Sequence, residues 1–349
     1  MSRKKTILIA PLDWGIGHAT RCIPIIYALI AQKFNVIIGS NGRASILLKK
    51  EFPDIKIITI PGYNIKYSRY LPMSISMILQ LPKIAFKIQK EKKTLTRLIE
   101  KYKIDGVISD NRFGFFNNKI PCVFITHQLK IKSTYFSKYI QKINYYFINN
   151  YNQCWVIDDL KKNLAGSLSN PHNIPKNTIY IGTQSRFKKI KKKKTYKILA
   201  IISGPEPQRT ILEKKLMKSL AKRQEKNIII LGKTEEEKTD KIGNLIIKSH
   251  LKTKELNNVI EEAEIIISRS GYSTIMDLNK LGKKAILIPT PGQTEQEYIA
   301  ETLFKKGICY TQKQSEIDLD TAINESKKYS GFETTKNKNT DWEKLFSLF

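Results

Sequence analysis

Four glycine-containing stretches of the chain place polar side chains directly after an apolar run. The first, residues 13–21, reads DWGIGHATR and sets His18 directly behind Gly17. An imidazole titrates near neutral pH, so His18 is suited to proton transfer. A dinucleotide-binding turn is disfavoured, because the G-x-G-x-x-G pattern needs a third glycine where Thr20 stands.

Two further stretches have the pattern of a phosphate site at the start of a helix. Residues 203–210 read SGPEPQRT and residues 268–278 read SRSGYSTIMDL, and each precedes a helical pattern. Backbone N–H groups and a macrodipole equivalent to about +0.5 charge favour an anion at such a position. Asp277, one turn into the second helix, can accept hydrogen bonds from ribose hydroxyls. An ordinary loop or a capped helix is the alternative interpretation for both.

The fourth stretch, residues 288–301, reads IPTPGQTEQEYIAE and places Glu295, Gln296 and Glu297 where a helix should begin. Such side chains can hydrogen-bond several sugar hydroxyls, although acids at a helix start also simply favour the dipole. Two polar segments, SDNRFG at 109–114 and THQLK at 126–130, follow predicted strands nearer the N-terminus. Their candidates for an acceptor site, or for steering phosphate, are Asp110, Asn111, Arg112, His127 and Gln128.

The elements that must position these residues alternate between strand-like and helix-length segments. The predicted strands are 6–10, 35–40, 55–61, 105–110, 122–127 and 154–158, then 196–203, 227–232, 245–249, 264–270 and 285–290. This alternation predicts an α/β chain with two Rossmann-like domains, each a doubly wound parallel sheet, facing across a cleft. Ligands of such sheets bind beyond the carboxyl ends of the strands, which is where the four stretches fall.

The expected domain limits follow from the charge pattern. We predict an acceptor-side domain over 1–187, a basic linker over 188–195 and a nucleotide-sugar donor domain over 196–330. Residues 331–349 should form a helix that packs back on the body, since the tail carries a one-sided apolar stripe.

In combination, the motifs resemble the GT-B glycosyltransferases of family 28, the MurG-like N-acetylglucosaminyltransferases. SRSGYSTIMDL resembles that family's S-R-x-G-x-x-T-x-x-E segment, with Asp277 in place of its ribose-binding Glu. PGQTEQEYIA resembles the sugar-binding stretch with paired glutamines, the first of which is Glu295 here. The resemblance is strongest at 7–21 and 264–301 and poor at 62–104.

The resemblance implies the roles of the remaining site residues. DWGIGHATR resembles the loop beside the donor diphosphate and the acceptor, which makes His18 the candidate general base, with Asp13 as its rival. Leu251 would meet the base of the nucleotide. SGPEP stands where the family has a glycine-rich loop at the start of the second domain. It differs from that loop in carrying prolines and Glu206. The implied donor-binding residues are Gly17, Ser203, Gly204, Leu251, Arg269, Ser270, Gly271, Ser273, Thr274, Asp277, Gly292, Gln293, Glu295 and Gln296.

The implied activity is transfer of a hexose or N-acetylhexosamine from a nucleotide diphosphate donor, UDP-linked, to an acceptor hydroxyl with inversion. The family implies no metal and no cofactor. The implied partners are the nucleotide sugar and a glycan or lipid-linked acceptor. An NDP-sugar epimerase of GT-B type is one alternative. A basic nucleic-acid-binding protein is the other, although no nucleic-acid motif supports it and we expect no nucleic acid.

Composition indicates the cellular compartment of the protein and whether it contacts a membrane. Lys and Arg exceed Asp and Glu by 61 − 31 = 30, which suits an anionic partner, but lysine is abundant throughout and can simply be a solvated surface. The four cysteines are scattered, which fits a reducing cytosol, and no apolar run is long enough for a span. Residues 70–93 and 131–151 are basic and apolar on one side. They could lie on the inner face of the cytoplasmic membrane or be ordinary core helices.

Overall fold

The computed structural model describes residues 3–63, 80–132, 137–161, 163–333 and 340–349. The chain divides into two compact units. The first comprises Met1–Gln184 together with Asn337–Phe349, and the second comprises Ser185–Lys336. The division thus falls shortly before the predicted linker, and residues 188–195 form neither helix nor strand. They belong to the second unit, where the Thr195 N–H donates to the Glu262 carbonyl at 2.9 Å.

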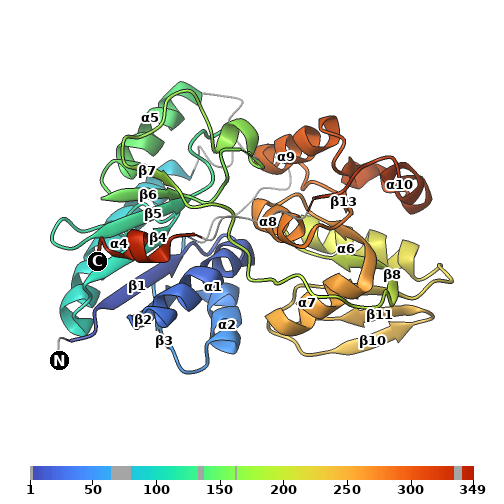
Figure 1. Ribbon diagram of the computed structural model, residues 1–349, viewed down its shortest axis with the longest axis horizontal. Coiled ribbons are helices and arrows are strands. Elements are labelled where there is room, and N and C mark those ends of the chain that lie inside the picture. The colour runs from blue at the N-terminus through green and yellow to red at the C-terminus, as the bar shows by residue number, and fades with distance from the viewer. Residues whose placement is uncertain (1–2, 64–79, 133–136, 162, 334–339) are drawn as a thin grey trace. The chain divides into compact units, whose positions relative to one another are not determined.

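The first unit is a seven-stranded parallel sheet flanked by helices (Figure 1). Its strands run in the order β3-β2-β1-β4-β5-β6-β7. They are β1 (Thr6–Pro11), β2 (Asn35–Ser40), β3 (Lys56–Thr59), β4 (Gly106–Asp110), β5 (Cys122–Thr126), β6 (Gln153–Val156) and β7 (Thr178–Tyr180). Its helices are α1 (Ile16–Ala31), α2 (Gly42–Glu51), α4 (Leu81–Tyr102), α5 (Ser137–Ile148) and α11 (Trp342–Phe346).

Strand order in this sheet fixes where a ligand can bind. The chain leaves β1 toward β2 on one side and returns to β4 on the other, so the order reverses between β1 and β4. Pro11 is the register partner of Asp110, which brings the two strand ends together. Ligands of open parallel sheets bind in the crevice at such a reversal. His18 and Asp110 both come from this point.

The C-terminal tail packs against the first unit. Phe346 is buried, and its ring centroid lies 6.0 Å from that of Trp155 and 5.7 Å from that of Phe34. We expect Phe346→Ala to lower the free energy of unfolding by about 3–5 kcal/mol, because a large buried ring leaves a cavity. Denaturant unfolding measures this, with Glu343→Ala on the exposed side of α11 as the control. Equal midpoints for the two variants would show that the tail adds nothing to stability.

The second unit repeats the plan of the first. Its sheet runs β10-β11-β9-β8-β12-β13-β14, parallel except for the edge pair of β10 and β11. The strands are β8 (Tyr196–Ile201), β9 (Asn227–Ile230), β10 (Thr239–Ile242), β11 (Leu245–Lys248), β12 (Ala263–Ser268), β13 (Ala285–Leu287) and β14 (Tyr310–Thr311). The helices are α6 (Gln208–Leu220), α7 (Thr253–Glu262), α8 (Tyr272–Leu281), α9 (Thr294–Lys305) and α10 (Leu319–Ser326). Here the order reverses between β8 and β12, which are followed by Ser203 and Arg269.

The predicted doubly wound fold class is confirmed, with three strands missed. β7 and β14 are edge strands of two or three residues, and β10 is exposed along its whole length. Short or fully exposed strands carry no alternating apolar pattern. The two predicted basic helices fall partly outside the described residues, at 70–79 and 133–136; the described parts form α4 and α5. No helix in the described residues is long and apolar enough to cross a membrane.

Candidate functional site

Four polar side chains meet at the strand-order reversal of the first unit. His18 and Arg21 project from the start of α1, Asp110 ends β4, and His127 follows β5. The Asp110 carboxylate lies 3.1 Å from His18 Nδ1 and accepts from Arg21 Nε at 2.8 Å. Arg21 also lies 2.8 Å from His18 Nδ1 and 3.0 Å from His127 Nδ1. The structure therefore brings three of the predicted residues into one cluster around an arginine.

The charges of this cluster favour a neutral His18. Burial would by itself raise the pKa of Asp110, but Arg21 and His18 hold that pKa well below its usual range. The pKa of His18 is lowered from its ordinary 6.5 by burial and by the Arg21 charge, with Asp110 acting in the opposite direction. At neutral pH the Asp110–Arg21 pair is ionised and the His18 imidazole is neutral. A neutral imidazole is the form that can accept a proton.

Arginine has only donors, so Arg21 constrains the histidine tautomers. His127 Nδ1 faces Arg21 at 3.0 Å and must accept, which places the proton of the neutral ring on Nε2. His18 Nδ1 faces both Arg21 and the Asp110 carboxylate. By the same rule, Arg21 at 2.8 Å would make His18 Nδ1 an acceptor and leave the hydrogen on Nε2. For His18 Nε2 to accept a proton, Nδ1 must instead carry the hydrogen and donate it to Asp110, and the Arg21 contact with Nδ1 must be lost. The carboxylate would then stabilise the imidazolium that forms.

Asp13, the rival base, lies beside a second buried network. Its Oδ1 is 3.5 Å from Arg112 and 3.4 Å from the backbone N–H of Tyr63. Arg112 is fully buried and donates to Glu91 at 2.7 Å and to the Pro11 carbonyl at 2.9 Å. The guanidinium of Arg112 is therefore engaged in holding the loops after β1 and β4. A role for Arg112 toward an acceptor stays a prediction.

The remaining acceptor candidates lie at the ends of the same strands. Asn111 adopts a left-handed backbone (φ 54°), and its N–H donates to the Ile125 carbonyl at 3.1 Å. The Gln128 N–H donates to the Thr126 hydroxyl at 3.0 Å. Both side chains are half-buried. The structure thus places Asp110 and His127 in the cluster with His18, and Asn111 and Gln128 are their chain neighbours. Their role toward an acceptor stays a prediction.

In the second unit, Arg269 ties the three predicted donor loops together. Its guanidinium donates to the Gln208 carbonyl at 2.8 Å, to the Pro289 carbonyl at 3.0 Å and, more weakly, to the Ser203 carbonyl at 3.5 Å. Arg269 is buried, and burial lowers its pKa to about 10. These donors point at carbonyl oxygens, so the structure shows Arg269 holding the three loops together. A direct contact of Arg269 with the donor stays a prediction.

Gln296 joins two of these loops. Its side-chain oxygen accepts from the Thr290 N–H at 2.9 Å, and its side-chain nitrogen donates to Gln293. The Ser270 hydroxyl donates to the Gln296 carbonyl at 2.7 Å. A Cβ added to Gly271 would lie 4.0 Å from the Gln296 amide nitrogen. The predicted sugar-binding loop and the predicted phosphate loop therefore lie side by side.

Asp277 contacts the first residue of the second unit, Ser185. The Ser185 hydroxyl donates to its carboxylate at 2.5 Å. Burial raises the pKa of Asp277 to about 6, although the Arg186 charge and the Ser185 hydrogen bond oppose that rise. Leu251, the predicted base contact, is buried and lies three residues after β11. Among the other predicted donor residues, Gly204 and Gly292 lie in loops and Gly17 lies in α1 of the first unit. The first turns of α8 and α9 hold the rest: Ser273, Thr274 and Glu295.

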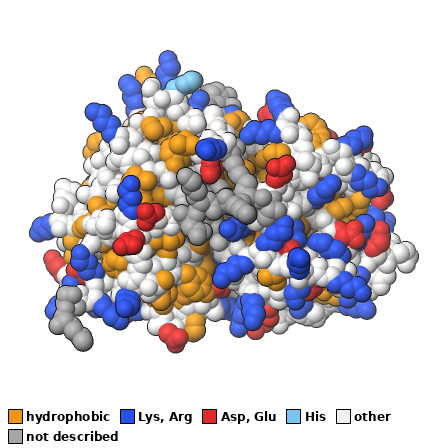
Figure 2. Space-filling view, viewed as in Figure 1, with side chains coloured by type: hydrophobic (Ala, Val, Ile, Leu, Met, Phe, Trp, Pro, Cys, Tyr) orange, Lys and Arg blue, Asp and Glu red, His pale blue; other side chains and the backbone are white. Residues whose placement is uncertain are grey.

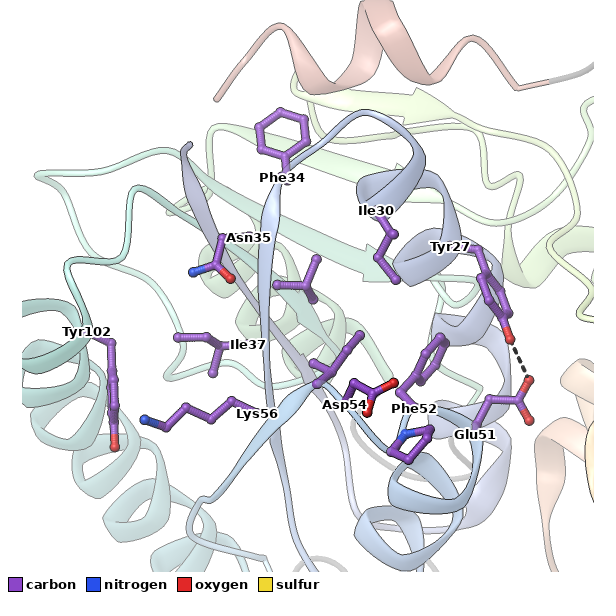
Figure 3. A pocket seen from close by; sticks show the side chains of 13 residues that line it. Tyr27, Ile30, Phe34, Asn35, Ile37, Glu51, Phe52, Asp54, Lys56 and Tyr102 are labelled. Carbon is purple, nitrogen blue, oxygen red and sulfur yellow. Dashed lines mark hydrogen bonds between the residues drawn. The ribbon is translucent and has the colours of Figure 1, made fainter. Parts of the chain in front are cut away.

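A pocket of about 650 Å³ lies elsewhere in the first unit. Tyr27, Phe52, Lys56 and Tyr102 line it, at the amino ends of β2 and β3 (Figure 3). Figure 2 shows hydrophobic side chains gathered over the neighbouring helix α2. None of the predicted site residues lines this pocket. It lies at the wrong end of the strands for a ligand of a doubly wound sheet, so we assign it no part in the reaction.

Sequence reasoning missed Arg21 and Glu91. Arg21 was within reach, because it lies three residues after His18 on a helix and so shares its face. No sequence motif indicates the role of Glu91, because α4 lies in the part of the chain where the family resemblance is poor. In the described residues, no three His, Cys, Asp or Glu side chains are grouped as a metal site would require.

Comparison with known proteins agrees with this architecture. The family model "Glycosyltransferase family 28 C-terminal domain" matches residues 206–346. The chain carries a family 28 glycosyltransferase C-terminal domain. The resemblance predicted from the motifs is thereby confirmed, and the donor loops of the second unit all lie in or next to this family 28 domain.

Relatives in sequence match only part of the chain. One is the UDP-N-acetylglucosamine–N-acetylmuramyl-(pentapeptide) pyrophosphoryl-undecaprenol N-acetylglucosamine transferase of Caldicellulosiruptor saccharolyticus, 33% identical over 84 residues. That match covers 22% of this chain and 23% of the relative. The transferase of the same name from Exiguobacterium sibiricum is 39% identical over 64 residues, 18% of each chain. The chain therefore matches less than a quarter of the length of these relatives.

Solved structures resemble the whole chain. MurG of Acinetobacter baumannii has a TM-score of 0.53 at 14% identity, covering 99% of this chain and 93% of that one. The calicheamicin glycosyltransferase CalG4 has a TM-score of 0.64 at 10% identity, covering 99% and 94%. At such identities the likeness concerns the fold, and the predicted GT-B fold is confirmed.

Proposed function

We propose that the chain is a glycosyltransferase that moves a hexose or N-acetylhexosamine from a UDP-linked donor to an acceptor hydroxyl with inversion. The observation that carries this proposal is the convergence of three loops on Arg269 and Gln296 inside a family 28 domain. UDP is the favoured nucleotide because the matching relatives are named for UDP-N-acetylglucosamine. Their names also specify a pyrophosphoryl-undecaprenol acceptor, so a lipid-linked acceptor is part of the proposal.

The proposed chemistry assigns one task to each unit. In the first, His18 Nε2 takes the proton of the acceptor hydroxyl, and Asp110 stabilises the imidazolium. The acceptor oxygen bonds to the anomeric carbon as the bond to the diphosphate breaks, and UDP leaves with the electron pair. In the second unit, Asp277 holds the ribose and Gln296 and Glu295 hold the sugar. The N-terminus of α8 stabilises the leaving diphosphate without a metal.

A product assay tests the proposal. The protein is incubated in EDTA with UDP-glucose, UDP-galactose or UDP-N-acetylglucosamine, with and without a polyprenyl-diphosphate-linked sugar, and products are identified by mass spectrometry. A disaccharide product formed only with acceptor supports transfer, and NMR of its anomeric proton tests inversion. Conversion of one UDP-sugar into another without acceptor would favour the epimerase and contradict the proposal.

We expect Asp277→Ala to weaken UDP binding by about tenfold or more, because hydrogen bonds to a charged group are lost. The pKa of about 6 adds a pH dependence. A carboxylate accepts ribose hydrogen bonds best when ionised, so wild-type affinity should fall as pH drops through 6. Calorimetric titrations at pH 5, 6 and 7.5 measure both effects. An unchanged dissociation constant in the variant would remove Asp277 from the ribose site.

We also propose that α5 contacts an anionic membrane. Tyr139, Ile143 and Tyr146 are 69%, 53% and 68% exposed and share one helix face, with Lys138 and Lys142 exposed nearby. Figure 2 shows hydrophobic and basic side chains close together in the region of α5.

This contact predicts a loss of vesicle binding on removing the apolar face. The double variant Tyr139→Ser with Ile143→Ser should sediment several-fold less with phosphatidylglycerol vesicles than the wild type. The control exchanges Ile30 and Ile46, which are 43% and 39% exposed elsewhere in the same unit, for serine. If both double variants sediment like the wild type, α5 is not the contact.

A further inference from the structure

A buried hydroxyl without a partner lies among the donor loops. Thr290 is 1% exposed, and its Oγ1 forms no hydrogen bond with the described residues. Its backbone is fully engaged: the N–H donates to Gln296 at 2.9 Å, and the carbonyl accepts from the Gln293 N–H at 3.1 Å. A buried hydroxyl left without a partner is unfavourable, because it has lost its hydrogen bonds to water. A ligand that supplies the missing partner would recover that energy on binding.

The unpartnered hydroxyl faces Gly204. A Cβ added to Gly204 would lie 3.4 Å from Thr290 Oγ1 and 3.6 Å from Arg269 Nε. Gly204 is exposed and has a backbone angle φ of 108°, which side-chain-bearing residues rarely adopt. Because Gly204 has no side chain, no atom of that residue's own side chain fills the place next to the hydroxyl. An oxygen atom placed there would meet a hydroxyl donor close to a guanidinium.

The start of helix α8 lies beside the same place. Gln296 connects Thr290 to Gly271, the residue that precedes α8, through its hydrogen bond to the Thr290 N–H and its 4.0 Å approach to the Cβ position of Gly271. No side chain caps α8 at Gly271. The positive end of the helix dipole favours an anion at this position.

The start of α6, the other helix of this region, is already occupied. The Glu206 carboxylate accepts from Arg209 Nε at 2.6 Å and from the Thr210 N–H at 3.3 Å. Burial alone would raise the pKa of Glu206, but these hydrogen bonds and the Arg209 charge lower it, so the group is an anion at neutral pH. A phosphate would be repelled from the first turn of α6. The Gly204 and Thr290 side of the loop remains for it.

We propose that Thr290 Oγ1 donates a hydrogen bond to a phosphate oxygen of the nucleoside diphosphate, in the space bounded by Gly204 and the start of α8. This inference rests on the proposed function, because it names a phosphate contact of the same donor. It differs from the roles predicted for the neighbouring residues, since the sequence pattern singled out Gly292 to Gln296 in this loop and not Thr290.

Titration of Thr290→Val with UDP and with uridine tests the proposal. Valine keeps the shape of threonine and removes the hydroxyl. UDP should bind about tenfold or more weakly, as expected for one lost hydrogen bond to a charged group, while uridine binds as it does to the wild type. Thr290→Ser, which keeps the hydroxyl, should restore UDP binding. Thr311→Val is the control, because its hydroxyl donates to the Leu287 carbonyl at 2.9 Å on the neighbouring strand.

Stability provides an independent readout. Because the Thr290 hydroxyl has no partner among the described residues, the melting temperature of ligand-free Thr290→Val should equal or exceed that of the wild type. Unchanged UDP affinity in this variant, or equal weakening of UDP and uridine, would overturn the phosphate contact. Wild-type protein that binds neither UDP nor uridine would instead overturn the proposed donor, and the inference with it.

Discussion

Replacement of His18 by alanine should lower turnover by about 10²–10⁴ while leaving the dissociation constant of UDP within twofold. The imidazole is the proposed base, and loss of a positioned base has this typical effect. Donor binding is assigned to the second unit, so it should persist. Steady-state kinetics and calorimetric titration separate the two effects. Turnover equal to that of the wild type would remove His18 from the base role.

The pH profile distinguishes His18 from Asp13. A base must be deprotonated, and burial and the Arg21 charge lower the pKa of His18 from 6.5. Activity should therefore be constant near pH 7 and fall on an acid limb below 6.5. Asp13→Asn is the matched comparison and should keep this limb and most of the turnover. If Asp13→Asn abolishes the limb and His18→Ala retains it, Asp13 is the base.

Replacement of Glu91 by alanine should lower the free energy of unfolding by about 3–5 kcal/mol, because it leaves the buried charge of Arg112 without its partner. The two side chains are fully buried and joined at 2.7 Å. Glu91 also accepts from the Tyr63 hydroxyl at 2.7 Å and from the Gly114 N–H at 3.0 Å, so two further donors lose their acceptor. Denaturant unfolding followed by tryptophan fluorescence measures the change.

An exposed ion pair of the same unit serves as control. Arg3 donates to Asp105 at 2.5 Å, and the Arg3 side chain is 55% exposed. Because exposed pairs contribute about 0–1 kcal/mol, Arg3→Ala should hardly move the unfolding midpoint. A Glu91 variant as stable as the Arg3 variant would show that the network around Arg112 does not support the loops after β1 and β4.

The sequence predicts the frame of the molecule well. Strands such as 6–10 and 264–270 are apolar and β-branched because both faces of a parallel sheet are covered, and this makes them legible. Their alternation with helix-length segments sets the doubly wound order, and the order sets which loops meet. His18, Asp110, Arg269 and Gln296 could therefore be assigned to the right strand ends without coordinates.

Which atoms of those residues face a ligand could not be predicted. Arg269 and Arg112 are polar residues in candidate loops, yet their guanidinium groups donate to backbone carbonyls. The residues next to them in the sequence do not indicate which carbonyls these are. The loop after β13 is another case: the Gln296 amide bonds Thr290 and Gln293, which the motif did not indicate, and its contact with a sugar stays a prediction. Such contacts form between residues far apart in the chain, so hydrophobic periodicity and motif spacing cannot predict them.

The measurement that tests the central claim most directly is calorimetric titration of the purified protein with UDP, dTDP and GDP in the presence of EDTA. We predict saturable binding of UDP at one site per chain, with weaker binding of GDP. Binding in EDTA would also support a diphosphate site that needs no metal. Failure of all three nucleotides to bind would contradict the proposal that this chain uses a nucleotide-sugar donor.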